Sequence, residues 1–427
     1  MSLNSGMVKI CVKMLVAALV CSAAVVLLSG CIGLSAPARY RVLVSSDIGG
    51  TDPDDNQSMT HLLMYSDLFD LEGLVSSASY GPGSKEEFLR MIDVYEQDYP
   101  VLKQKYRKLM KPDDLRALCK QGRKGLASYE GFDTPTEGSE WIVKCARRKS
   151  NRPLYVLVWG TLEDVAQALH DAPDIADKIR VYWIGGPNKK WGVNAYTYVA
   201  RNFPDLWMIE NNSSYRGFIC NIEVEGAGNL GKDFKNYYEG KIKMGDTPSL
   251  LYMMNGDPAD PEGESWGGSF EKITESPYTL FTQNTTDKDT VAVYSVIEFH
   301  FDGPVLNEGL VGEKMFTFRA ARQDWDGVYL GKGKYGVRYS AKQPEVLTYE
   351  TFSEIRELDG QKGTLVISPL WPGKKTAEGI PLGDNWYSDR LDPSLFEGVW
   401  QGSATVSRHR NEVLADWMER WNTLKID

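Results

Sequence analysis

The chain has 427 residues, of which 42% are hydrophobic and 25% are charged, so it can bury a large core. We expect one large α/β domain with a smaller additional unit. The net charge of −10 argues against nonspecific nucleic-acid binding, which needs a basic surface, so we expect no nucleic-acid partner.

Residues 1–31 have the pattern of a bacterial lipoprotein signal peptide. A short basic region precedes an apolar run, residues 15–28, that is too short to span a membrane comfortably. The segment Leu28–Cys31 resembles a lipoprotein cleavage site, with Cys31 as the lipidated first residue of the mature protein. Because Ile32 follows rather than Asp, we expect a lipid anchor in the outer membrane of a bacterial cell envelope, facing the periplasm or the exterior. An uncleaved membrane anchor is the alternative.

An acidic turn follows the first predicted strand. The apolar run Arg41–Val44 indicates a buried parallel strand, and Asn56–Tyr65 has helical spacing of its apolar residues. Between them stand four carboxylates, Asp47, Asp52, Asp54 and Asp55. Ligands bind at this end of open α/β sheets, and carboxylates this close repel unless a cation or shared protons neutralise them. A hard divalent cation, Ca²⁺ first of all, is the simplest solution; a solvated acidic turn with an Asp N-cap is the alternative.

Strands and helices then alternate along the chain. Apolar runs predict strands over residues 71–77, 153–160 and 180–186. Amphipathic or polar helical patterns cover residues 85–105, 113–129, 136–143 and 161–169. This alternation predicts an α/β fold with a doubly wound, mostly parallel sheet.

The stretch Ser45–Asp55 resembles the N-terminal signature of the inosine–uridine-type nucleoside hydrolases. It is still more similar to a nucleoside hydrolase-like family of secreted bacterial proteins that carries a cellulose-binding label. The resemblance covers about Arg41 to Lys272 and resumes at the C-terminal helix. It implies that Asp47, Asp54 and Asp55 are metal ligands and that Asp47 is also the general base. Two differences from the nucleoside hydrolases are Ser45 in place of their first Asp and a longer loop before Asp54, which is typical of the secreted family.

The resemblance implies two more metal ligands. Trp159 lies where the hydrolases give a backbone carbonyl to the metal, so its side chain need not be a ligand type. Asp246 precedes an apolar helix, at the position of the Asp in the hydrolase His-Asp-Pro motif. Gly245 replaces the histidine of that motif, which leaves the general acid open. An ordinary helix N-cap is the alternative role of Asp246.

Several residues between 189 and 268 are candidates for binding a sugar. In residues 189–218 the polar and aromatic candidates are Trp191, Asn194, Glu210, Asn211 and Asn212, and we favour Asn194 and Asn211. Trp266, in a Trp-Gly-Gly element of the secreted family, could stack on a sugar or a base. Turn residues and a core tryptophan are the alternative roles.

The last third of the chain has the sequence pattern of β-strands instead of alternating strands and helices. Strand-like runs separated by Gly, Asp and Pro turns occur at residues 291–296, 314–319 and 363–367. We therefore expect a β-rich insertion over residues 286–402, which splits the α/β domain into residues 38–285 and a final helix in residues 403–427.

The favoured function is Ca²⁺-dependent hydrolysis of an N- or O-glycosidic bond in a small nucleoside or glycoside. Asp47 would take the proton from the attacking water. The main alternative is a carbohydrate-binding surface lipoprotein with an inactive site. Mg²⁺-dependent phosphoryl transfer ranks lowest because a phosphate-cradling Gly-Lys-Ser/Thr loop is missing. The sequence leaves open whether the chain forms a homo-oligomer.

Overall fold

The computed structural model describes residues 39–370 and 379–425, and the predicted lipidation site Cys31 lies outside them. The described residues from Tyr40 onward form one compact unit. Among the described residues, no helix has both the length and the apolar character needed to cross a membrane.

The first of two sheets is doubly wound and almost entirely parallel, which confirms the predicted α/β fold. Its eight strands are, in spatial order, β3 (Cys119–Gln121), β2 (Asp70–Ser76), β1 (Arg41–Ser46), β4 (Leu154–Val158), β5 (Ile179–Ile184), β6 (Trp207–Asn211), β17 (Trp386–Asp389) and β7 (Phe270–Lys272). Only the edge strand β7 runs antiparallel to its neighbour. The strand order turns around between β1 and β4, which is the place where such sheets bind ligands.

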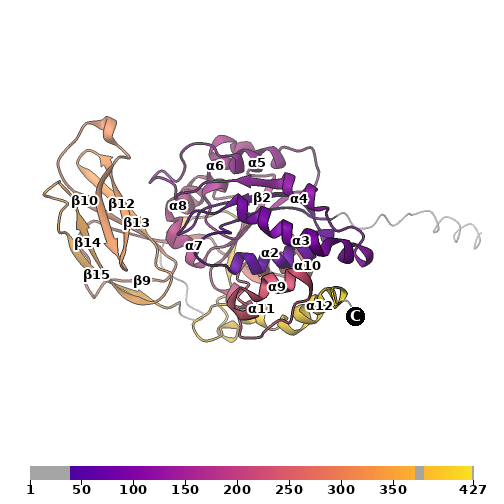
Figure 1. Ribbon diagram of the computed structural model, residues 1–427. Helices are drawn as coiled ribbons and strands as arrows, with labels where there is room; N and C mark the ends of the chain where they lie inside the picture. Colours follow the sequence, from indigo (N-terminus) through magenta and orange to yellow (C-terminus); the bar gives the residue numbers. More distant parts are fainter. Residues whose placement is uncertain (1–38, 371–378, 426–427) are drawn as a thin grey trace, which may run out of the picture. The chain divides into compact units, whose positions relative to one another are not determined.

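Helices cover both faces of this sheet. They are α2 (Asp54–Met64), α3 (Lys85–Lys105), α4 (Pro112–Leu118), α5 (Glu137–Ala146), α6 (Glu163–Asp171), α7 (Gly186–Trp191), α8 (Val193–Asn202), α9 (Gly228–Lys235), α10 (Thr247–Met254), α11 (Ala404–Ser407) and α12 (Arg410–Thr423). Side chains alternate along β1, so Val42 and Val44 join the core under α2, α3 and α10, whereas Leu43 joins the core under α5 and α6. Figure 1 shows α5 and α6 on one side and α2, α3, α9 and α10 on the other.

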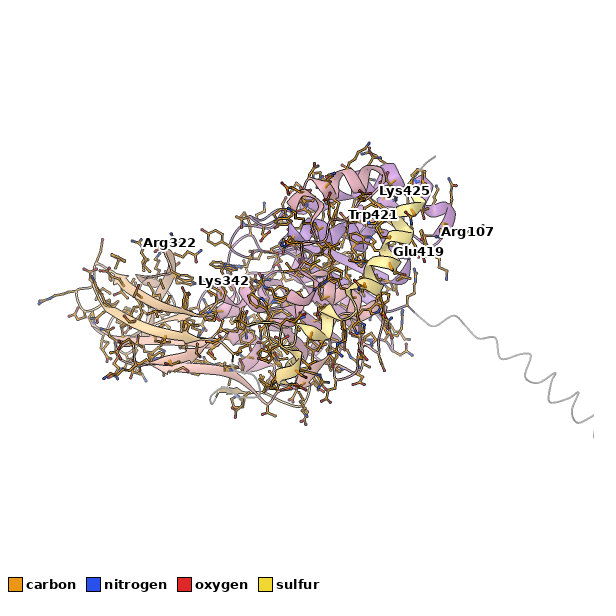
Figure 2. All side chains as sticks on the ribbon, turned by 90° about the horizontal axis from the view of Figure 1, so that it is seen from below. Arg107, Arg322, Lys342, Glu419, Trp421 and Lys425 are labelled. Atoms are coloured by element: carbon orange, nitrogen blue, oxygen red, sulfur yellow. The ribbon has the colours of Figure 1, made fainter. Side chains whose placement is uncertain are left out.

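The C-terminal helix α12 packs on the α/β part. Trp417 and Trp421 are fully buried in the core beneath α2 and α3. Trp421 and the exposed Glu419 are labelled on this helix in Figure 2. Phe234 of α9 contacts the rings of both Trp417 and Trp421, which joins two segments that are far apart in sequence.

The second sheet is β-rich and mainly antiparallel. Its strands are, in spatial order, β16 (Gly379–Pro381), β8 (Glu275–Phe281), β10 (Val296–Asp302), β13 (Lys334–Tyr339), β12 (Gln323–Gly331), β11 (Lys314–Ala320), β14 (Glu345–Phe352), β15 (Lys362–Ser368) and β9 (Thr290–Ala292). It has a separate core, rich in Phe and Tyr side chains. Two elements differ from the boundaries expected for the insertion, residues 286–402. Strand β8 lies before residue 286 but belongs to the second sheet, and β17 lies inside this range but belongs to the first sheet. The buried Trp386 explains the return of β17, because it fills the core between β6 and α8.

One predicted helix is much shorter than expected. The polar pattern over residues 113–129 predicted a helix, but α4 ends at Leu118 and Cys119–Gln121 becomes the edge strand β3. Gly122 follows so close to β2 that a Cβ atom there would lie 2.3 Å from the Ser76 carbonyl oxygen. Pairing with β2 therefore overrides the local helical preference.

Candidate functional site

Asp47 lies at the C-terminal end of β1, at the start of a tight turn. The Gly50 N–H donates a hydrogen bond to the Asp47 carbonyl oxygen at 3.0 Å. Gly49 has φ +81°, and a Cβ atom there would lie 2.8 Å from the Cβ of Ser84. Only glycine fits this position, and the turn leads the chain from β1 into the acidic start of α2.

Asp54 and Asp55 occupy the first turn of α2, where the partial positive charge of the helix N-terminus favours carboxylates. The Ser46 hydroxyl donates a hydrogen bond to Asp55 Oδ1 and accepts one from the Ile48 N–H at 3.0 Å. This arrangement fixes the Asp55 carboxylate against the end of β1.

Asp246 reaches the same place from a distant part of the chain. The ligand oxygens of Asp54, Asp55 and Asp246 all lie within 4.8 Å of one another. Asp246 is the N-cap residue of α10 by position, but its side chain makes no capping hydrogen bond to the described backbone. Its Oδ2 atom is buried and has no hydrogen-bond partner among the described residues. The ordinary N-cap role is therefore not what holds this carboxylate here.

Two side chains position the backbone around Asp246. The Ser249 hydroxyl donates to the Asp246 carbonyl oxygen at 2.7 Å and accepts from Trp159 Nε1 at 2.8 Å, which joins the end of β4 to the start of α10. Gln57 of α2 is fully buried; it donates to the carbonyl oxygens of Tyr237 and Lys241 and accepts from the Lys243 N–H. These bonds attach the segment before Asp246 to the helix that carries Asp54 and Asp55.

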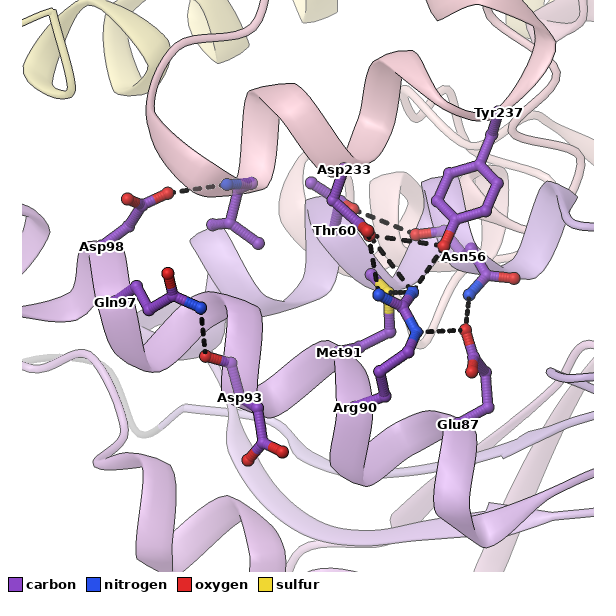
Figure 3. Close-up of polar contacts among 11 residues, drawn as sticks. Asn56, Thr60, Glu87, Arg90, Met91, Asp93, Gln97, Asp98, Asp233 and Tyr237 are labelled. Atoms are coloured by element: carbon purple, nitrogen blue, oxygen red, sulfur yellow. Dashed lines mark hydrogen bonds and ion pairs between the residues drawn. The ribbon is translucent and has the colours of Figure 1, made fainter.

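A polar network also supports the start of α2 (Figure 3). The Asn56 side chain donates to Glu87 of α3 at 2.6 Å, and Glu87 accepts from Arg90 at 2.8 Å. Arg90 in turn pairs with Asp233 of α9 at 2.8 Å. The network joins three helices directly behind the acidic turn.

The carboxylates of this cluster are electrostatically unfavourable to one another. Burial, together with the charges of neighbouring aspartates, raises the pKa of Asp54, Asp55 and Asp246 well above the usual range. Two carboxylates at such a separation repel by roughly 3 kcal/mol at an effective dielectric constant of about 20. A bound cation would remove this repulsion, and carboxylate oxygens are the ligands that hard divalent cations prefer.

The cluster faces a cavity of about 550 Å³ at the C-terminal ends of β1, β4 and β5. Asp47, Asp54, Asp55, Trp159 and Asp246 all line this acidic pocket. Asp47 is partly exposed in it, and burial raises the pKa of its carboxyl group. The Trp159 carbonyl oxygen accepts a hydrogen bond from Asn188 Nδ2 at 2.9 Å and keeps a second lone pair. The fold thus brings together all five residues predicted as metal ligands.

The three predicted substrate-binding residues are not among the described residues that line the acidic pocket. Asn211 is fully buried. Its side-chain nitrogen donates to the Tyr182 hydroxyl, and its side-chain oxygen accepts from the Ser214 hydroxyl and the Tyr215 N–H. Trp266 packs on the core near α12 and donates to Glu412 at 3.2 Å. Asn194 lines a neighbouring cavity instead. The hydrogen bonds of Asn211 connect the end of β6 with β5 and with residues 214–215.

The acidic pocket contains other residues that the motif did not reveal. They include Tyr80, Asn188, Tyr215, Arg216, Tyr238, Lys243, Gln323 and Lys342, together with Trp191, which the sequence had marked as able to meet a sugar. Gln323 and Lys342 come from the β-rich sheet region, far along the chain from the acidic motif. The local sequence could have indicated Asn188, because it follows Gly185–Gly186 at the end of the buried strand β5. Polar residues at this position lie at the edge of the sheet where ligands bind.

The solved structures similar to this chain include three with low sequence identity. A nucleoside hydrolase-related hypothetical protein from Saccharophagus degradans, described as associated with carbohydrate metabolism, is 18% identical over 78% of this chain and 100% of its own, with a TM-score of 0.49. The inosine-uridine preferring nucleoside hydrolase from Bacillus anthracis is 14% identical over 56% of this chain and 87% of its own, with a TM-score of 0.32. A purine-preferring ribonucleoside hydrolase from Gardnerella vaginalis is 12% identical over 55% and 83%, with a TM-score of 0.32. No curated protein matches significantly.

A family model matches the part of the chain that carries most of the site. Residues 41–222 match the domain described as "Cellulose-binding Sde182, nucleoside hydrolase-like domain". This range contains Asp47, Asp54, Asp55 and Trp159, whereas Asp246 lies beyond it. The match confirms the resemblance seen in the Ser45–Asp55 motif: over residues 41–222 the chain is similar to a nucleoside hydrolase-like domain.

Proposed function

We propose that the protein binds a divalent cation, Ca²⁺, in the acidic pocket and hydrolyses an N- or O-glycosidic bond there. The observation that supports this most directly is the convergence of Asp54, Asp55 and Asp246, with a buried Asp246 oxygen that has no partner among the described residues. Protein stability alone gives no reason to bring together three mutually repelling carboxylates, two of them buried.

The residues present fit such a cation. Asp54, Asp55 and Asp246 offer carboxylate oxygens, and Asp47 and the Trp159 carbonyl line the same pocket. Ca²⁺ takes six to eight oxygen ligands in flexible geometry, which suits a mixed set of carboxylates and a carbonyl. When bound, the cation would orient water and substrate hydroxyls and lower the pKa of the water.

Asp47 is the residue that takes the proton in this proposal. It lines the pocket beside the cluster without belonging to the closest three carboxylates. Burial raises the pKa of Asp47, which makes its carboxylate a stronger base than an exposed one. Loss of a proton from water to Asp47 would give the nucleophile that attacks the anomeric carbon of the sugar.

The test combines calorimetry with a turnover screen. We expect Ca²⁺ to bind the full chain, and Ca²⁺-dependent release of sugar from at least one compound in a panel of nucleosides and aryl glycosides. Asp47→Asn should retain Ca²⁺ and lose turnover by about 10²–10⁴-fold, the usual contribution of a general base. Full activity of Asp47→Asn on a confirmed substrate would exclude Asp47 as the base.

The cellulose-binding description of the matched family favours a second candidate, a carbohydrate-binding protein with an inactive site. Both functions use the same pocket, so they differ only in turnover. Ca²⁺ and sugar binding without cleavage of any panel compound would support this second candidate.

We further propose that Cys31 is lipidated and tethers the protein to a bacterial envelope membrane. The apolar run and the small residues before this cysteine support the proposal. Metabolic labelling with a fatty acid should mark the wild-type protein and not Cys31→Ser.

A further inference from the structure

A second cavity adjoins the acidic pocket. It has a volume of about 820 Å³, and Tyr80, Trp191 and Gln323 line both cavities. Its remaining wall comes from residues 126–129 and the start of α8 in the α/β part, and from strands β11, β12 and β13 with adjoining loops in the second sheet. We call this cavity the Trp325 groove, after the tryptophan of β12 that lines it.

Aromatic side chains lie along the path from the acidic pocket to the Trp325 groove. The rings of Tyr80 and Trp191 are 4.8 Å apart between centroids, at the place where the two cavities meet. Tyr80 is 58% exposed although it is a large aromatic residue, so its ring is available to a ligand. Trp191 and Trp325 are also only partly buried.

A buried lysine holds the two tryptophans in place. Lys190 Nζ lies 4.8 Å from the ring centroid of Trp191 and 5.3 Å from that of Trp325. Lys190 is 4% exposed, so these cation–π contacts are largely shielded from water. Cation–π contacts are stronger when they are shielded in this way. Trp191 ends α7 in the α/β part, and Trp325 belongs to β12 of the second sheet. Lys190 therefore contacts one aromatic ring from each part of the protein.

The charges on the wall of the Trp325 groove mostly neutralise one another. Arg319 pairs with Asp324 at 2.7 Å, and Lys314 pairs with Asp326 at 2.5 Å. Arg322 and Lys342, both labelled in Figure 2, stand on loops of the β-rich region and line the groove and the acidic pocket respectively. A lining of flat aromatic faces with polar groups around them suits a sugar, which has apolar C–H faces and a rim of hydroxyls.

We propose that the Trp325 groove is an additional sugar-binding subsite, so that the ligand is an extended glycan that reaches from the acidic pocket across Trp191 to Trp325. This inference rests on the proposed function of the acidic pocket and specifies its substrate class. The acidic pocket alone, at about 550 Å³, has the size typical of a whole small-molecule site, roughly 300–1,000 Å³. A free nucleoside would leave the larger groove unused. The β-rich sheet thereby forms one wall of the binding site.

The experiment compares short and long sugars on the full-length, Ca²⁺-loaded protein. Calorimetry on Asp47→Asn, which is intended to stop turnover, would use monosaccharide and β-1,4-linked tetrasaccharide pairs of glucose, xylose, mannose and galactose. We expect at least one tetrasaccharide to bind about tenfold or more tightly than its monosaccharide, equivalent to about 1.4 kcal/mol. Trp325→Ala should remove this gain and leave monosaccharide affinity within about twofold.

Two further variants make the result specific. Trp325→Phe keeps a flat ring and should retain most of the gain, which separates ring contact from misfolding. Val346→Ala changes an exposed side chain of β14 outside the groove and should change neither affinity. The proposal is overturned if none of the tetrasaccharides gains affinity, or if Trp325→Ala weakens both sugar lengths equally.

The same proteins distinguish this inference from the proposed function. Wild-type turnover of a nucleoside or aryl glycoside without any length-dependent binding would keep the hydrolase and exclude the subsite. Length-dependent binding that needs Trp325, without turnover by the wild type, would keep the subsite and exclude the hydrolase.

Discussion

Asp246 is the carboxylate in the acidic pocket that depends most on a cation, because its Oδ2 atom has no hydrogen-bond partner among the described residues. We expect Asp246→Asn to have opposite effects on the free energy of unfolding with and without Ca²⁺. Without Ca²⁺ the variant should be more stable than the wild type by roughly 1–3 kcal/mol, since one repelling charge is gone. With Ca²⁺ at 100 times its Kd the wild type should gain about 2.7 kcal/mol and the variant much less. Urea unfolding measures the free energy of unfolding with and without Ca²⁺, and Asp257→Asn, at an exposed position, is the matched control. If Ca²⁺ stabilised Asp246→Asn as much as the wild type, the proposed cation site would be contradicted.

Glu163 makes a separate residue-scale prediction about pH. It is buried at the start of α6, and burial raises its pKa to about 7. Between pH 4.5 and 7 the folded state therefore binds more protons than the unfolded state, whose carboxyl keeps its usual pKa of 4.5. Stability is then lost as the pH rises through this window. In saturating Ca²⁺, Glu163→Gln should reduce this loss by about 1–3 kcal/mol between pH 5 and pH 8. An unchanged slope of unfolding free energy against pH would contradict the assignment.

At the scale of elements, the N-termini of α2 and α10 must keep a fixed position relative to each other for Asp54, Asp55 and Asp246 to meet. Gln57 does this through three hydrogen bonds to the backbone of residues 237–243. Gln57→Leu has similar volume but cannot make these bonds, so we expect Ca²⁺ affinity to fall by about 10–100-fold, as for other groups that orient metal ligands. Calorimetric titration of Ca²⁺ would measure the change. Gln57→Glu replaces the donating nitrogen with a second oxygen, so it can accept from the Lys243 N–H but cannot donate to the two carbonyl oxygens. A Gln57→Leu protein with wild-type affinity would exclude the positioning role.

At the scale of the whole molecule, Glu298 connects the β-rich sheet to the α/β part. This buried carboxylate of β10 accepts hydrogen bonds from Arg338 at 3.0 Å and from Tyr129, which precedes α5. Although burial raises its pKa, His300 and Arg338 together hold the pKa well below its usual range. Glu298→Ala leaves Arg338 buried with its charge unpaired, which should lower the free energy of unfolding by about 3–5 kcal/mol. Urea unfolding should show a much smaller effect for Asp384→Ala, which removes one partner of an exposed pair. Equal effects would contradict the connecting role.

The sequence by itself determined the parts of this protein that are encoded locally. The buried run at β1, the glycine turn and the start of α2 lie within residues 41–64, so their spacing alone predicts a strand, an acidic turn and a helix. The alternation of strands and helices likewise predicts the parallel sheet, although edge pairing replaced part of the predicted helix near Cys119. Asp246 could be assigned to the site only through the resemblance to the nucleoside hydrolases.

Only the tertiary structure decided which distant segments share the site. It placed Trp191 and Lys342 in the acidic pocket and Trp325 in the adjoining groove, returned β17 to the first sheet, and buried the Asn211 side chain. The physical reason is that such contacts depend on how whole faces of helices and sheets pack, and packing leaves no periodicity in the sequence around each residue.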